Sequence, residues 1–125
     1  MTSIQRREEL QFLTEFLSGK GYHNVEILFG AFWGNDYLDW IPVSVKLHKI
    51  DKKIALAEAN STGSLEEDDF FVIIIELQTE VLFCHEHDIH LAHNKENEVK
   101  AAILNHWRTL EYNVKQQTSL QRGNG

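Results

Sequence analysis

The chain has 125 residues, of which 42% are hydrophobic and 25% are charged, and its formal net charge is −7. This length predicts a single domain, and the composition is ordinary for a globular protein. No apolar run approaches the roughly 20 residues needed to span a bilayer, the N-terminus is charged where a signal peptide needs an apolar core, and the lone cysteine excludes an internal disulfide. We therefore expect a cytoplasmic protein of bacterial type, with no membrane partner.

Acidic residues are concentrated in the middle of the chain. Residues 54–99 include eleven aspartates and glutamates but only one lysine, a balance of −10, while the rest of the chain is mildly basic. Proteins bind phosphate backbones through clustered Lys and Arg side chains. We therefore expect no direct binding of nucleic acid by this segment, and a basic protein as the partner that its charge favours.

The core is predicted to form around residues 70–77, FFVIIIEL. The stretch is too short for a buried helix, and branching at Cβ favours an extended backbone. A half-buried strand would alternate between apolar and polar residues, and this stretch does not. It is therefore predicted to be a central strand covered on both faces.

The first half of the chain predicts one helix followed by strands. Apolar residues at helical spacing indicate a helix over roughly residues 3–18, which ends near Gly19. Residues 25–33 and 37–50 are rich in strand formers and are separated by a turn at 34–36. Pro42 cannot donate to a ladder, so this portion of the strand should lie at an edge or outside the pairing. Residues 54–59 fit either a strand or a short helix, and we favour the strand.

The second half predicts a loop, more strands and a last helix. The composition of residues 60–69 is that of a loop, and residues 78–79 are short enough for a hairpin after the central strand. Residues 81–93 should be extended, with a break near 86–88. A helix is expected from Asn94 to about Gln116. Residues 117–125 are then a mobile tail.

These elements predict an α+β fold formed by a single domain over residues 1–116. Short connections favour a mainly antiparallel sheet of four or five strands. Helices at the N-terminus and the C-terminus can both pack on one face of this sheet, which gives a two-layer sandwich. The opposite face, or an uncovered edge, would then be open to a partner or to a second copy in a homodimer.

A group of potential metal ligands occupies residues 84–90, CHEHDIH. On a continuous strand His85 and His87 would share one face, and Cys84 and His90 would share the other. Two imidazoles at this spacing can bind one zinc ion, but the sequence indicates no third ligand. We therefore prefer the interpretation that these histidines pack at a polar strand end, and we expect no metal and no cofactor.

Cys84 also raises the question of a cysteine nucleophile. Neighbouring residues on a strand face opposite ways, so Cys84 and His85 should be badly placed to form a thiolate–imidazolium pair. None of the local cysteine-protease signatures is present. We expect Cys84 to be a small buried hydrophobe, the chain to contain no catalytic residues, and the protein not to be an enzyme.

Two stretches are candidates for binding a partner. Residues 32–40, FWGNDYLDW, place aromatic and acidic side chains around one turn, and residues 66–69, EEDD, form an acidic loop. Tyrosine and tryptophan dominate binding hot spots, whereas charge runs are most often solvated loops. The candidate partner-binding residues are Trp33, Asp36, Tyr37, Asp39, Glu66, Glu67, Asp68 and Asp69.

The sequence therefore favours a small acidic module that binds a basic protein. An immunity-type inhibitor that neutralises a basic, nuclease-like toxin by direct binding is the specific form of this hypothesis. The alternative is a small metal-dependent enzyme or metal sensor that uses the His85/His87 cluster. The two hypotheses differ in whether the purified protein holds a metal.

Overall fold

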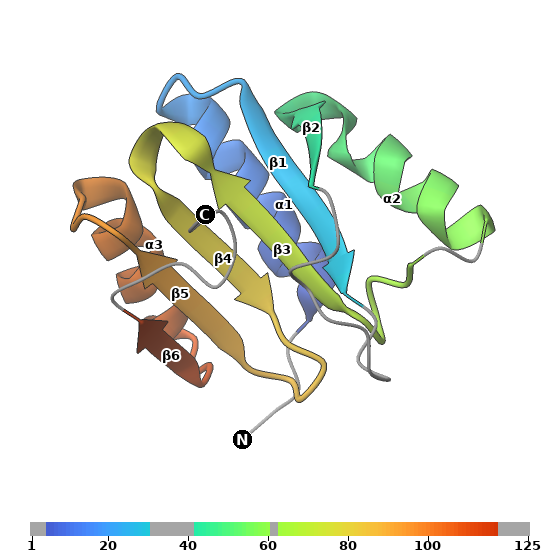
Figure 1. The fold of residues 1–125 in the computed structure, drawn as a ribbon. Helices are drawn as coiled ribbons and strands as arrows, with labels where there is room; N and C mark the ends of the chain where they lie inside the picture. The colour runs from blue at the N-terminus through green and yellow to red at the C-terminus, as the bar shows by residue number, and fades with distance from the viewer. Residues whose placement is uncertain (1–4, 31–41, 61–62, 118–125) are drawn as a thin grey trace.

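The computed structural model describes residues 5–30, 42–60 and 63–117. These residues form one six-stranded sheet in the order β2-β1-β3-β4-β5-β6, together with three α-helices (Figure 1). The strands are β1 (Asn24–Gly30), β2 (Val43–Lys46), β3 (Asp69–Ile74), β4 (Thr79–Phe83), β5 (Ile89–His93) and β6 (Val114–Gln117). Neighbouring strands are antiparallel except for β5 and β6, which run parallel. The predicted α+β class is confirmed, with six strands in place of four or five.

Helices α1 (Arg6–Gly19) and α3 (Glu98–Thr109) lie behind the same face of the sheet in Figure 1. The side chains of Leu13 and Leu17 from α1 and of Trp107 from α3 belong to one core cluster with alternate residues of β1, β3, β4 and β5. Both terminal helices therefore cover one face, as the two-layer prediction requires. None of the helices in the described residues combines the length and the hydrophobicity that a membrane-spanning segment requires.

The predicted central strand is confirmed as β3, which lies between β1 and β4 and has all six residues buried. It ends at Ile74, and the rest of the predicted stretch forms a 3₁₀ segment, η3 (Ile75–Leu77), in which Ile75 is exposed. Phe70, Val72 and Ile74 face the helices, whereas Phe71 and Ile73 belong to a second, smaller cluster on the other face. This division follows from the two-residue period of a strand. Because both faces of β3 are buried, its sequence is apolar at successive positions and does not alternate with polar residues.

Residues 43–59 differ from the two strands that were predicted there. Only Val43–Lys46 is extended, and it forms the edge strand β2, with Pro42 directly before it. A short 3₁₀ segment, η2 (Leu47–Lys49), then leads into the helix α2 (Ile50–Ala59). Ile50 and Ile54 are the buried residues of α2 and belong to the core cluster. Because they are four residues apart, a helix places both side chains on the face that contacts the core. The preference for a strand at 54–59 was wrong.

The C-terminal helix is shorter than predicted. The side chain of Asn97 accepts a hydrogen bond from the backbone N–H of Lys100 at 2.8 Å and caps the start of α3. The helix ends at Thr109, and Glu111 follows with a positive φ of 65°. The chain then pairs with β5 as β6, from Val114 to Gln117. The sheet thus includes Gln117, the first residue of the predicted tail, while 118–125 lie outside the described residues.

Candidate functional site

The candidate site lies at the end of the sheet where β1 and β4 finish and β3 and β5 begin. Gly30, the last residue of β1, pairs with Asp69, the first residue of β3. Phe83, the last residue of β4, pairs with Ile89, the first residue of β5. The acidic loop at 66–69 leads into β3, and the histidine-rich turn at 84–88 connects the neighbouring strand β4 to β5. The two segments therefore lie next to each other at this end of the sheet. We call this region the acidic end.

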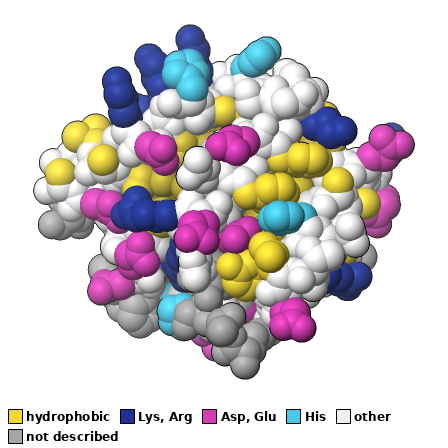
Figure 2. Space-filling view, turned by 180° about the vertical axis from the view of Figure 1, so that it is seen from behind, with side chains coloured by type: hydrophobic (Ala, Val, Ile, Leu, Met, Phe, Trp, Pro, Cys, Tyr) yellow, Lys and Arg dark blue, Asp and Glu magenta, His cyan; other side chains and the backbone are white. Residues whose placement is uncertain are grey.

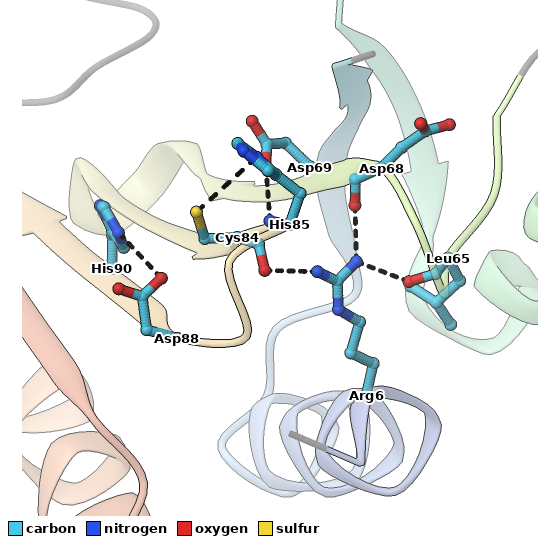
Figure 3. A network of polar contacts seen from close by, with 8 residues as sticks. All are labelled: Arg6, Leu65, Asp68, Asp69, Cys84, His85, Asp88 and His90. Atoms are coloured by element: carbon cyan, nitrogen blue, oxygen red, sulfur yellow. Dashed lines mark hydrogen bonds and ion pairs between the residues drawn. The ribbon is translucent and has the colours of Figure 1, made fainter. Parts of the chain in front are cut away.

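Arg6, at the start of α1, holds these two segments together (Figure 3). Its guanidinium donates to the backbone carbonyls of Leu65, at 2.7 Å, and Asp68 before β3, and to the carbonyl of Cys84 after β4. Burial lowers the pKa of Arg6, although the nearby carboxylates act in the opposite direction. The buried cation thus fixes the backbone of both loops from beneath.

The four acids of the predicted loop occupy two different environments. Glu66 and Glu67 are exposed, and Glu66 lies 3.3 Å from Nε of Arg7. Asp68 and Asp69 are only 5% and 1% exposed. The carboxylate of Asp68 accepts the backbone N–H of Ser64 at 2.8 Å, so it closes the turn that carries the two glutamates. Only half of the predicted acidic patch therefore faces solvent.

The predicted aromatic residues Trp33 and Tyr37, with Asp36 and Asp39 beside them, lie outside the described residues. The chain enters that segment from Gly30, which is paired with Asp69. The described chain therefore leads into the aromatic segment directly beside the acidic loop.

A thiol lies between two carboxylate–imidazole pairs at the acidic end (Figure 3). Nδ1 of His85 lies 2.7 Å from Oδ1 of Asp69, and Nε2 of His90 lies 3.2 Å from Oδ1 of Asp88. The Cys84 sulfur lies 3.9 Å from Nδ1 of His85. Asp69, Cys84 and His85 form one group whose potential ligand atoms all lie within 4.8 Å of one another, and Cys84, Asp88 and His90 form another.

This arrangement corrects the prediction that Cys84 and His85 point to opposite sides. The prediction assumed a continuous strand, but β4 ends at Phe83 and the two residues follow in the turn. Strand alternation therefore no longer applies to them. Sequence reasoning also missed Asp69 as their partner, because it lies at the far end of a run of acids that looked solvated. The sequence feature that could have indicated the burial of Asp69 is its position directly before the apolar run.

The geometry does not activate the thiol as a nucleophile. A relay needs one imidazole nitrogen on the thiol and the other on the carboxylate, whereas Nδ1 of His85 faces both Cys84 and Asp69. Burial, with the hydrogen bond to Asp88 and the charge of Asp69, raises the pKa of Cys84 to about 12. The thiol is therefore protonated at neutral pH.

The alternative metal site would use His85 and His87 together, but the described residues do not group these two side chains. His87 is exposed, has a positive φ of 66°, and belongs to neither of the two groups found among the described residues. The second imidazole beside the thiol comes instead from His90 on β5. Its partner Asp88 also lies 2.9 Å from Nζ of Lys115 on β6. Burial alone would raise the pKa of Asp88, but the hydrogen bonds from Lys115 and Cys84 outweigh it and lower this pKa.

The lysine-rich segment 46–53 lies at the other end of β1, where Lys46 pairs with Asn24. Lys46, Lys49, Lys52 and Lys53 are all exposed. On the face that carries the helices, Figure 2 shows acidic side chains spread over the centre, with lysine or arginine and histidine side chains gathered along its upper edge. The exposed lysines of this segment therefore lie at the end of β1 opposite the acidic end.

Comparison of the chain with protein-family models, with curated protein sequences and with solved structures finds no match.

Proposed function

We propose that the protein is a binding module that docks a basic protein through its acidic end. The observation that carries the proposal is the pairing of Gly30, the residue that precedes the aromatic segment 31–41 in the sequence, with Asp69, the last residue of the acidic loop. Glu66 and Glu67 are exposed there. Carboxylates around aromatic anchors are a suitable arrangement for a positively charged partner.

The acidic loop is supported in a way that suits recognition. Arg6 binds the carbonyls of Leu65 and Asp68, and the carboxylate of Asp68 binds the N–H of Ser64. A surface that is ordered before binding loses less conformational entropy on association. Asp68 thus supports the surface, whereas the two exposed glutamates would face the partner.

The specific form that we propose is an immunity-type inhibitor in the cytoplasm, which blocks a basic, nuclease-like toxin by covering it. A nuclease must carry positive charge to hold its phosphate substrate. An acidic inhibitor would therefore be attracted to the surface that the toxin needs for activity. The protonated thiol of Cys84, whose pKa is about 12, is consistent with binding without covalent chemistry.

The test begins with capture of the partner from the native organism and continues by surface plasmon resonance at two salt concentrations. The double variant Glu66→Lys, Glu67→Lys should slow association by about tenfold at low salt and flatten the salt dependence, because long-range attraction governs the on-rate. The matched control is Glu15→Lys, Glu76→Lys, which makes the same change of net charge at two other exposed positions.

The aromatic anchors are tested by dissociation. Replacing Trp33 or Tyr37 by Ala should speed dissociation by about tenfold or more if the side chain is a hot spot, because contacts at the centre of an interface govern the off-rate. An acidic partner would contradict the proposal. Equal effects of the two charge-reversal pairs, or dissociation indifferent to both aromatic changes, would also contradict it.

A further inference from the structure

We propose that Asp69, Cys84 and His85 form a binding site for a divalent metal ion, with zinc as the cation that fits best. The inference is independent of the proposed partner. It departs from the expectation, drawn from the sequence, that no metal is bound. What changes the conclusion is that the carboxylate, the thiol and the imidazole come together within 4.8 Å.

The donor atoms suit zinc in kind and in spacing. Zinc prefers sulfur and imidazole nitrogen and also accepts carboxylate oxygen, and it binds them tetrahedrally. Bonds of about 2.3 Å to sulfur and 2.0 Å to nitrogen place these two atoms about 3.5 Å apart. The Cys84 sulfur and Nδ1 of His85 lie 3.9 Å apart, close to that spacing. Nδ1 and Oδ1 of Asp69, now 2.7 Å apart, need only separate slightly.

The charges also balance. A thiolate from Cys84 and the carboxylate of Asp69 would neutralise a divalent cation, and His85 would add a neutral ligand. When zinc binds, the sulfur–zinc bond forms as the S–H bond breaks, and the proton passes to solvent. In the metal-free arrangement Nδ1 of His85 faces a carboxylate oxygen of Asp69 and therefore carries a ring proton. When the metal binds, Nδ1 gives this proton to solvent and Nε2 takes one up, so that the neutral ring presents the lone pair of Nδ1 to the metal. The affinity should therefore fall as the pH is lowered.

The surroundings provide both support and access. The backbone N–H of His85 donates to Oδ1 of Asp69 at 2.7 Å and would orient this ligand. Leu82 and Phe71 pack in the same cluster as Cys84 and supply the apolar surroundings usual at a metal site. The His85 side chain is 32% exposed, so the metal can approach from solvent. The fourth coordination position would be taken by water.

The Asp88–His90 pair is a less suitable site because its carboxylate is already committed. One oxygen of Asp88 lies 3.2 Å from His90, and the other lies 2.9 Å from Lys115. Asp88 is also hydrogen-bonded to the Cys84 thiol. We assign this pair to the support of the thiol, outside the set of ligands.

The probe is zinc added to untagged, chelator-stripped protein and followed by isothermal titration calorimetry. One equivalent should bind, and Cys84→Ser and His85→Ala should each weaken binding by more than about 100-fold, since even the loss of a partner outside the ligands costs 10–100-fold. The matched control His87→Ala removes an exposed imidazole two residues away and should bind as the wild type does.

A second probe, Co²⁺, requires no variant and therefore does not depend on their folding. Cobalt bound to the wild-type protein should give an intense thiolate-to-metal charge-transfer absorption and the strong visible bands of a tetrahedral ion. Absence of the charge-transfer band, absence of stoichiometric zinc, or a loss of affinity in His87→Ala as large as in His85→Ala would overturn the assignment. The His90→Ala variant should lose no more than about 100-fold, the cost of a residue outside the ligands.

Discussion

The indole N–H of Trp107 donates a hydrogen bond to Oε1 of Glu9 at 2.8 Å, across a sequence separation of 98 residues. The other oxygen of this buried carboxylate accepts from the hydroxyl of Tyr112 at 3.2 Å. Glu9 therefore connects the first helix to the last helix and to the segment before β6. Burial, with the nearby Glu9 charge, raises the pKa of Tyr112 and keeps its hydroxyl protonated as a donor.

Replacing Trp107 by Phe should lower the free energy of unfolding by about 3 kcal/mol. The change removes buried volume and takes a donor from a buried carboxylate, and each effect typically costs about 1–3 kcal/mol. Urea denaturation followed by circular dichroism measures the loss. The control Leu110→Ala, at a side chain that is 45% exposed just after the same helix, should cost no more than about 1 kcal/mol. Equal losses in the two variants would contradict the role of this hydrogen bond.

Replacing Ile74 by Asp should leave no folded protein at ordinary temperature. Ile74 is fully buried against the helices at the end of β3, and an unpaired charge there costs several kcal/mol. The neighbouring Ile75→Asp is the control, because that side chain is 52% exposed and should accept the charge. Circular dichroism and thermal melting distinguish the two variants. A cooperative transition near the wild-type temperature for Ile74→Asp would show that β3 is not central.

The Cys84 thiol should react slowly with iodoacetamide in chelator-treated native protein at pH 8. A rise in pKa from 9.0 to about 12 lowers the thiolate fraction about 1000-fold. The greater nucleophilicity of a more basic thiolate recovers roughly 15–30-fold of this loss, so the net reduction is about 30-fold or more. Mass spectrometry follows the labelling, with the same protein in urea as the reference. Labelling of the folded protein at the unfolded rate would indicate an activated nucleophile.

Glu58 should contribute to stability at neutral pH and lose this contribution in acid. Burial alone would raise its pKa, but hydrogen bonds from the Leu65 N–H and from Arg7 outweigh burial and lower the pKa. A carboxylate with a lowered pKa in the folded state stabilises above its unfolded pKa, near 4.3, and the effect fades as pH falls through the folded value.

The pH dependence of this contribution is tested by urea denaturation of the variant Glu58→Gln at pH 7 and below pH 3. It should cost about 0.5–1 kcal/mol at pH 7 and much less in acid, where the wild-type side chain is protonated as well. The exposed Glu15→Gln should differ little from the wild type at either pH. A cost for Glu58→Gln that is the same at both values would show that the charge of Glu58 does not matter.

Elements whose local pattern agrees with their burial could be predicted from the sequence. The unbroken apolar run gave β3, and helical spacing gave α1. The segment 54–59 is ambiguous because its alanines fit a helix or a strand, and only contact with the core selects α2. Val114 continues the helical spacing of α3, so nothing local shows that the helix stops at Thr109. The pairing of β6 with β5 is a tertiary effect that overrides the local pattern.

The candidate site was predictable only in part, for a related reason. A run of four acids is normally solvated, and two of them are buried because Arg6 lies beneath the loop. No sequence pattern links an arginine in the first helix to a loop about sixty residues later. The group around Cys84 was missed because it depends on where β4 ends. Both errors concern contacts between segments that lie far apart in the chain.

The Glu9–Trp107 contact also affects what happens while the chain is being synthesised. A ribosome adds about 5–20 residues per second, so Trp107 follows Glu9 by roughly 5 to 20 s. During this interval α2, whose Glu58 pairs with Arg7, is already synthesised, but α1 still lacks its contacts with α3. Because closure of the core depends on such distant contacts, folding should be slow for a chain of this size. Nascent chains should therefore bind chaperones through α1, and this binding should end soon after α3 leaves the ribosome.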